Sequence, residues 1–182
     1  MLLELAKKRK TVRIFSDKKP DIEDIKYAIN VAKEAPSGMN AQPWHFKIVD
    51  AQKEKEKIRE IVEKEERKFY ESSKGKLKEF LKNANITWKK EFLTQAPYLL
   101  FVYSDKSAPF SKESTWLAIG YLLLALEEIG LSTVTYTPPN LNDFSFGNYK
   151  LEVILPIGYG NDPKEKYHRK NIDEIISFND IF

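Results

Sequence analysis

The sequence predicts a single domain in which helices alternate with the strands of a β-sheet. Two short apolar runs, Tyr98 to Tyr103 and Leu151 to Leu155, have the pattern of strands that are covered on both faces and therefore lie inside a sheet. Residues Thr115 to Ile129 are apolar on nearly every side, which is typical of a buried helix. A length of 182 residues suits one hydrophobic core, so we expect one domain over residues 1–182.

The first part of the chain predicts two helices and a strand. Residues Leu2 to Lys8 favour a helix, and the segment after it is expected to be extended. Asp21 can cap a second helix, whose apolar residues recur at three- and four-residue spacing at Ile22, Ile25, Ile29 and Ala32. We expect that helix to end at Ala35-Pro36-Ser37-Gly38, because proline disfavours helical geometry in the residue before it. Trp44 to Val49 then indicates a strand.

The middle of the chain is rich in lysine and glutamate. From Ala51 to Lys90 the apolar positions are sparse, which indicates surface helices with a narrow buried stripe. Within it, Glu65 to Trp88 is the only stretch that looks like an insertion, and its composition is typical of a solvated helical face. Beyond Gly130, which ends the buried helix, Ser132 to Tyr136 predicts another strand and Gly158 to Lys170 a polar loop.

The composition excludes several classes of protein. The chain has no cysteine, so disulfides, thiolate metal sites and cysteine nucleophiles are excluded. His45 and His168 are its only histidines and lie far apart in sequence, so we predict no metal site and no histidine-based triad. The net charge of +3 is small beside 30 basic and 27 acidic side chains, so we predict no nucleic-acid partner. No apolar run is long enough to cross a membrane and no signal peptide is evident, so we expect a cytoplasmic protein without membrane contact.

A basic segment follows the first predicted helix, at Arg9-Lys10-Thr11-Val12-Arg13. Alternate residues of an extended segment point the same way, so Arg9, Thr11 and Arg13 can converge on one anion such as a phosphate. Clusters of lysine and arginine are also common on protein surfaces. The segment by itself therefore leaves two interpretations open, an anion site and a solvated basic patch.

A polar loop is the second candidate, at Pro36-Ser37-Gly38-Met39-Asn40-Ala41-Gln42-Pro43-Trp44. Two prolines brace it, and its serine hydroxyl and two side-chain amides can hydrogen-bond to a flat heterocycle with polar edges. The contrasting interpretation is an ordinary connection between a helix and a strand, with Trp44 in the core.

Taken together, the two segments resemble the nitroreductase family. The pattern Arg-x-Thr-x-Arg stands at residues 9–13, and the highly specific pattern Ala-Pro-Ser-x-x-Asn-x-Gln-Pro-Trp stands at residues 35–44. Further matches are Ala96-Pro97 before an apolar strand, Gly130-Leu131-Ser132 after the buried helix, and Gly158-Tyr159-Gly160 followed by Arg169-Lys170. The likeness spans nearly the whole chain.

The resemblance implies an α+β fold, with a mixed β-sheet flanked by helices, in an intertwined homodimer that holds two FMN molecules at its interface. The strongly apolar helix at Thr115 to Ile129 agrees with this, because a second subunit would cover it. The resemblance also implies that the chemistry takes place on the flavin N5, so we predict no catalytic acid or base from the chain.

Cofactor residues are carried over from the family by position. The residues implied to hold the FMN phosphate and ribityl chain are Arg9, Lys10, Thr11 and Arg13. Arg13 is alternatively placed at the pyrimidine edge of the ring. A C-terminal basic residue is implied to close on the phosphate, either Arg169 or Lys170, with Arg169 ranked first.

The ring itself is implied to be contacted from two other places. Pro36, Ser37 and Asn40 resemble the contribution of the other subunit to the isoalloxazine. Many relatives also present a glycine-containing segment near the flavin N5, whereas this chain has Thr135-Tyr136-Thr137-Pro138-Pro139. Two prolines remove two donors, which leaves the amide of Tyr136 or of Thr137 as the candidate for that contact.

The resemblance implies an FMN-dependent oxidoreductase. It would take hydride from NADH or NADPH and pass electrons to a nitroaromatic, a quinone or a similar flat acceptor by a ping-pong mechanism. Two further functions stay open. A non-catalytic flavin-binding or carrier protein would need the same residues, and some relatives of this fold remove halogen from an aromatic ring or fragment the flavin. Those relatives usually carry an added lid, for which only Glu65 to Trp88 is available.

Overall fold

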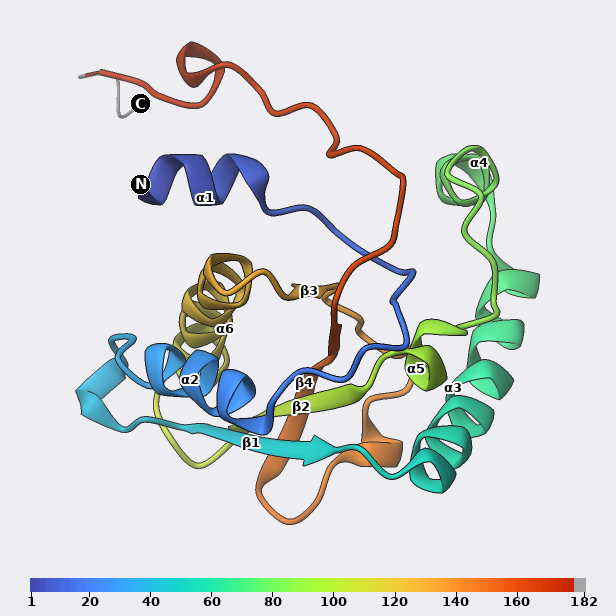
Figure 1. Cartoon of the computed structure of the whole chain (residues 1–182), viewed down its shortest axis with the longest axis horizontal. Coiled ribbons are helices and arrows are strands. Elements are labelled where there is room, and N and C mark those ends of the chain that lie inside the picture. The colour runs from blue at the N-terminus through green and yellow to red at the C-terminus, as the bar shows by residue number, and fades with distance from the viewer. Residues whose placement is uncertain (179–182) are drawn as a thin grey trace.

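The structure is a computed structural model that describes residues 1–178, and it shows helices packed around one β-sheet (Figure 1). Short 3₁₀ helices are labelled η. The elements in chain order are α1 (Leu2–Lys8), α2 (Ile22–Ala32), η1 (Gly38–Asn40), β1 (Trp44–Val49), α3 (Gln52–Ser72), α4 (Gly75–Asn83), α5 (Phe92–Gln95), β2 (Tyr98–Asp105), α6 (Ser111–Glu128), β3 (Ser132–Thr133), η2 (Asn142–Phe144), β4 (Tyr149–Gly158) and η3 (Ile172–Glu174).

The sheet has the strand order β1-β2-β4-β3, and its three strand pairings are antiparallel. Ile157 of β4 lies between Tyr98 of β2 and Thr133 of β3. A parallel bridge between Thr11 and Thr133 adds the N-terminal segment next to β3. This bridge supplies the parallel component of the predicted mixed sheet. It also places the basic segment at the β3 edge.

Two hydrophobic layers cover the faces of the sheet. On one face α2 and α6 lie together (Figure 1), and Leu122 of α6 packs in the same cluster as Leu100 of β2. On the other face Val62 of α3 and Leu93 of α5 pack with Phe101 of β2. Successive residues of a strand point to opposite faces, so β2 is buried on both of its faces. The prediction of covered interior strands is confirmed for β2 and β4.

Several predicted boundaries need correction. Helix α6 begins at Ser111 instead of Thr115, because its first turn is polar and carries no apolar periodicity. Strand β3 ends at Thr133, and the predicted strand to Tyr136 returns to the sheet only as a bridge between Tyr136 and Ile154. Strand β4 continues to Gly158, the first residue of the predicted polar loop. Strand β4 also begins earlier than predicted, at Tyr149, and β2 continues past the predicted Tyr103 to Asp105. The other predicted helices and strands are present in the structure.

Helix α6 keeps apolar side chains at the surface of the chain. Leu117 is 49% exposed and Tyr121 is 41% exposed. Residues four apart in a helix share a face, so the two form one apolar stripe. Such a stripe is suited to contact with another chain. The predicted homodimer agrees with it and stays a prediction.

Residues 1–178 contain neither a membrane-crossing helix nor a cluster of metal ligands. None of the helices there combines the length and the apolar character that crossing a membrane requires. In the same residues no three histidine, aspartate or glutamate side chains are grouped so that they could hold a metal ion. Both histidines are exposed.

A buried lysine joins α3 to the start of β2. Lys55 is 4% exposed, and its Nζ donates to the carbonyl oxygens of Ala96 at 2.8 Å and Pro97 at 3.4 Å. Burial, followed by repulsion from Lys19, lowers the pKa of Lys55. This lysine belongs to the part of the chain that the sequence indicates as a charged surface. Its charge is nevertheless turned inward, where it satisfies two carbonyl groups.

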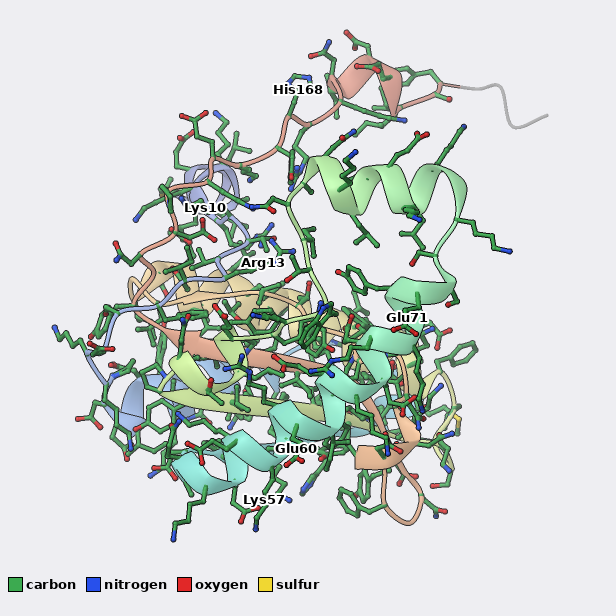
Figure 2. The ribbon with its side chains drawn as sticks, turned by 90° about the vertical axis from the view of Figure 1, so that its right-hand side faces the viewer. Lys10, Arg13, Lys57, Glu60, Glu71 and His168 are labelled. Carbon is green, nitrogen blue, oxygen red and sulfur yellow. The ribbon has the colours of Figure 1, made fainter. Side chains whose placement is uncertain are left out.

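We expect Lys55→Met to lower the free energy of unfolding by about 1–3 kcal/mol, because two acceptors lose their donor while the side-chain length is kept. Lys57→Met is the matched control, since Lys57 lies on the outer side of the same helix (Figure 2) and pairs with the exposed Glu54. Urea unfolding of both variants measures the difference. If the two variants were equally stable, the buried contact would contribute nothing.

Candidate functional site

A basic cavity lies between the N-terminal segment and the C-terminal arm, which we define as residues 161–178. Its volume is about 270 Å³, and it has five cationic side chains against one carboxylate. Figure 2 shows Lys10 and Arg13 on the N-terminal segment at this side of the molecule. The lining residues are Lys10, Thr11, Arg13, Lys164, Glu165, Lys166, Tyr167 and Arg169. The structure thus brings four predicted phosphate residues together from the two ends of the chain.

Like charges are crowded around this basic cavity. Burial, and then repulsion by Arg169, lowers the pKa of Arg9. The pKa of Lys166 is also lowered, by burial first and then by Arg169 and Arg9. A lowered pKa in a cation means that its charged form is disfavoured, and a bound anion would relieve this. The cations that surround this cavity fit an anion site, and that role stays a prediction.

Lys10 and Asp162 tie the two walls of the basic cavity together. The Nζ of Lys10 donates to the carbonyl oxygens of Asp162 and Lys164, both at 2.8 Å. The carboxylate of Asp162 in turn accepts the backbone N–H of Arg13 at 2.9 Å and that of Lys164 at 3.0 Å. We name these four hydrogen bonds the clasp. Two of the three N–H groups of Lys10 are used in it, so this predicted phosphate residue has a structural role as well.

A second, larger cavity of about 700 Å³ adjoins the first, because Arg13 and Lys164 line both. Its wall comes from the end of α3, the segment between α4 and α5, and the residues that follow β3. The further lining residues are Ile14, Glu66, Phe69, Tyr70, Asn85, Ile86, Thr87, Lys89, Lys90, Glu91, Phe92, Gln95, Val134, Thr135, Tyr136, Thr137 and Asp162. Predicted flavin residues and the lysine- and glutamate-rich region therefore meet in one place.

An ion pair is buried in the wall of the larger cavity. Glu66 and Lys90 are 4% and 5% exposed, and Lys90 Nζ lies 3.1 Å from Glu66 Oε2. The hydroxyl of Tyr136 donates to Glu66 Oε1 at 2.6 Å, and Lys90 Nζ donates to the carbonyl oxygen of Thr87 at 2.7 Å. Buried charges are tolerated when they are paired and hydrogen-bonded, and both conditions hold here.

Tyr70 completes this charged group. Lys90 Nζ donates to its hydroxyl oxygen at 3.4 Å. Burial, and then the charge of Glu66, raises the pKa of Tyr70 to about 12, so the hydroxyl is neutral at physiological pH. Burial lowers the pKa of Lys90, while Glu66 opposes that change. The positive charge of Arg13 lowers the pKa of both Tyr70 and Lys90, which puts Arg13 within electrostatic reach of the pair.

The segment after β3 lines the larger cavity, but the backbone amide of Tyr136 is already used. It donates to the carbonyl oxygen of Ile154 at 3.0 Å, and the amide of Ile154 donates back at 2.8 Å. The ring of Tyr136 packs edge-on against Phe92, with centroids 5.4 Å apart. This corrects the expectation that the Tyr136 amide is available to the flavin ring. The amide of Thr137 stays a prediction.

The polar loop lies away from both cavities. Pro36, Ser37 and Asn40 line neither of them, and neither does Lys170. Within the loop the hydroxyl oxygen of Ser37 accepts the backbone N–H of Gln42 at 3.0 Å. Residues that contact the flavin of another subunit need not line a cavity of their own chain. The predicted roles of these residues therefore stay predictions.

Three residues of the larger cavity, Glu66, Tyr70 and Lys90, are not among those that the sequence predicts for the site. The sequence pattern indicates that Glu65 to Trp88 is a solvated helical face, and the structure corrects this because Glu66 is buried and the segment walls a cavity. The spacing of residues along α3 nevertheless indicates that Glu66 is buried. Glu66 follows Val62 by four residues and so continues the buried stripe of α3, where a carboxylate is rare unless it is paired.

The fold and the two cavities define an α+β protein that encloses a basic site between the two ends of its chain. The chain belongs to the nitroreductase family: the sequence profile described as Nitroreductase family matches residues 6–156. It is similar to iodotyrosine deiodinase of Thermotoga neapolitana, with 55% identity over 98% of each chain. It is also 34% identical to iodotyrosine deiodinase 1 of Homo sapiens, over 95% of this chain and 66% of that one.

Solved structures show the same fold. A crystal structure of oxidized iodotyrosine deiodinase bound to FMN and 3-iodo-L-tyrosine matches with a TM-score of 0.94 and 55% identity, covering 98% of this chain and 99% of that one. A BluB-like flavoprotein from Clostridium difficile 630 matches with a TM-score of 0.79 and 25% identity over 98% of each chain. The resemblance and the fold class that the sequence predicts are confirmed.

We expect Glu66→Gln to lower the free energy of unfolding, by up to about 3–5 kcal/mol, because the ammonium of Lys90 loses its buried counter-charge. The loss should shrink as pH rises through the lowered pKa of Lys90, since a neutral amine needs no counter-charge. Urea unfolding across alkaline pH measures both effects. Glu65→Gln is the matched control, because Glu65 pairs with the exposed Lys68. A loss of equal size in the control would contradict the role given to the buried pair.

Proposed function

We propose that the chain is an FMN-dependent enzyme that removes halogen from the ring of a tyrosine-like amino acid. The observation that carries this proposal is the buried Glu66–Lys90 pair in the wall of the cavity that Arg13 also lines. A negative and a positive group side by side complement the ammonium and the carboxylate of an amino acid. The relatives named iodotyrosine deiodinase support dehalogenation over flavin storage and over reduction of quinones or nitroaromatics.

The basic cavity supports FMN as the cofactor. The phosphate of FMN is an anion, and the guanidinium groups of Arg13 and Arg169 are suited to bind it through paired hydrogen bonds. Thr11 can add a hydroxyl donor from the same wall, and Arg9 adds charge close to Arg169. Arg13 stands where the two cavities meet, so it can serve the phosphate side or the edge of the ring. Bound FMN in the relative with 55% identity supports the same assignment.

The larger cavity supports the substrate class. Its volume of about 700 Å³ lies within the range of small-molecule sites, about 300–1,000 Å³. We infer that the Lys90 ammonium binds the substrate carboxylate and that the Glu66 carboxylate binds the substrate ammonium. Tyr70, whose pKa is raised to about 12, stays a neutral hydrogen-bonding group beside them. Phe69 adds an apolar ring to the same wall.

The proposed reaction is a reductive dehalogenation. The carbon–halogen bond breaks, the halide leaves with its electron pair, and the ring carbon gains two electrons and a proton. FMN in its reduced form supplies the electrons when it is bound. The residues of the chain bind the amino-acid end of the substrate and orient its ring.

A homodimer completes the proposed site. Pro36, Ser37 and Asn40 lie away from the cavities of their own chain, which agrees with a role at the flavin ring of the other copy. Leu117 and Tyr121 offer an apolar face for that contact. The C-terminal arm closes the phosphate side in this proposal, through Arg169 ahead of Lys170.

NADH or NADPH as the source of electrons is part of the proposal. Nitroaromatics and quinones, the acceptors that the family resemblance implies, carry no paired ammonium and carboxylate. They would make no use of the Glu66 carboxylate and the Lys90 ammonium that line the cavity, which supports the amino-acid substrate over them.

The proposal is tested with protein that has been loaded with FMN, desalted and reduced by dithionite without oxygen. We expect retained flavin absorbance, and release of iodide and L-tyrosine on addition of 3-iodo-L-tyrosine. 2-Iodophenol, which has the same carbon–iodine bond and no amino-acid end, should react far more slowly. NADH with a quinone or a nitroaromatic, assayed in parallel, tests the broader activity. Retained flavin without iodide beyond that from free reduced FMN would rule out the dehalogenase, and absence of retained flavin would rule out the cofactor.

Substitution of Lys90 separates substrate recognition from the chemistry. We expect Lys90→Met to raise the KM for 3-iodo-L-tyrosine by about tenfold or more, as for loss of one partner of a buried charge pair. The rate with 2-iodophenol should change much less. Lys89→Met is the matched control, because Lys89 lines the same cavity without joining the pair.

A double variant separates lost recognition from lost folding. Glu66→Gln combined with Lys90→Met removes both buried charges, so the stability cost of a single unpaired ion is avoided. This variant should fold and still discriminate poorly between the two iodinated substrates. Normal selectivity for 3-iodo-L-tyrosine in either Lys90 variant would contradict the recognition role of the pair.

A further inference from the structure

We propose that Asp162 is a positioning residue that sets the affinity for the phosphate group of FMN by holding the two walls of the basic cavity in register. The inference rests on the proposed function, because it takes FMN as the ligand. It concerns a carboxylate, which is the group that a phosphate site is least expected to need.

Asp162 directs its charge to the backbone. It is 8% exposed, and two lysines of the basic cavity contact it. The Nζ of Lys10 donates to its backbone carbonyl oxygen, and the backbone N–H of Lys164 donates to its carboxylate. Both of its carboxylate oxygens nevertheless accept backbone N–H groups, Oδ2 from Arg13 and Oδ1 from Lys164. A buried carboxylate held in this way fixes the position of the backbone that it binds, since leaving either amide unpaired would be costly.

The clasp crosses between the two ends of the chain. Three of its four hydrogen bonds join residues that lie 149 to 154 positions apart. The fourth bond fixes the backbone at Lys164, near the start of the arm that carries Arg169. Asp162 therefore holds Arg13 on one wall and shapes the arm on the other. The spacing between the two arginines that line the basic cavity depends on this carboxylate.

The clasp extends to the larger cavity. Lys164, whose amide Asp162 holds, donates through its Nζ to the carbonyl oxygen of Ala84 at 3.0 Å. Ala84 is the C-terminal cap of α4, and the residues just after it wall the larger cavity. One carboxylate thus holds the backbone of Arg13 and Lys164, which line both cavities.

For a variant that lacks the Asp162 carboxylate, an effect of charge alone and a loss of positioning predict opposite changes in the affinity for FMN. Removing a negative charge beside a phosphate site should strengthen the binding of an anion. Removing a carboxylate that holds the walls together should weaken it. Glu165 lines the basic cavity and is exposed, so Glu165→Gln makes the same change of charge without the two buried backbone contacts.

The test compares Asp162→Asn with Glu165→Gln by titrating each apoprotein with FMN and with riboflavin, which lacks the phosphate. We expect Asp162→Asn to raise the Kd for FMN by about tenfold or more, as for the loss of one charge-assisted hydrogen bond in a positioned site. The Kd for riboflavin should change much less, so the preference for FMN over riboflavin falls. Glu165→Gln should leave that preference unchanged or increase it.

Asp162→Glu is the second variant, because it keeps the charge and moves it by one methylene. Positioning predicts a lower preference for FMN in this variant too, whereas a pure field effect predicts no change. Thermal unfolding of each apoprotein identifies the folded fraction on which the titrations are read. Wild-type protein that binds FMN, together with an Asp162→Asn variant that binds it as tightly or more tightly, would overturn the positioning role and leave the cofactor assignment standing. Wild-type protein that binds no FMN would overturn both.

Discussion

The rest of the structure depends on the antiparallel pairing of β2 with β4. These two strands form the middle of the sheet, and both layers of helices pack on them. Their apolar side chains are almost completely removed from water on both faces, which is the largest favourable contribution that a small domain has. Once β4 is in place, β3 and the N-terminal segment follow at its free side, and the end of β4 leads directly into the C-terminal arm. The position of the basic cavity is therefore a result of the central pairing.

Charged residues in this protein do more than cover its surface. Lys55 satisfies carbonyl groups inside the fold, Glu66 and Lys90 neutralise each other in a cavity wall, and Asp162 binds two amides. In each case a charged group is buried only where it meets several hydrogen-bonding partners. The hydrogen bonds that these buried groups need also fix the orientation of their side chains. A fixed orientation is what recognition of a charged ligand needs.

The sequence supports the prediction of most of the fold and of half of the site. Apolar periodicity locates α2, β2, β4 and α6, because burial imposes a repeat that can be read along the chain. The short motif at residues 9–13 indicates the anion site for a similar reason, since alternate residues of an extended segment, such as Thr11 and Arg13, share a face. The other half depends on contacts between distant parts of the chain. Glu66 and Lys90 look like members of a charged surface until tertiary structure brings them together, and the amide of Tyr136 looks free until its bridge to Ile154 is seen. The contact between Asp162 and Arg13 has no local signal, because the two residues are 149 positions apart.

The long separation between the two walls of the basic cavity has a consequence for the order of folding. Contacts between parts of the chain that are far apart in sequence form slowly, because the loop between them has to close before the contact gains anything. We therefore expect the central sheet to form before residues 161–169 return to the N-terminal segment and complete the cavity. A nascent chain that has grown only to Gly158 has its core strands but not the second wall. We expect an anion that binds there to be acquired by a fold that is already almost complete, and not to act as its folding nucleus.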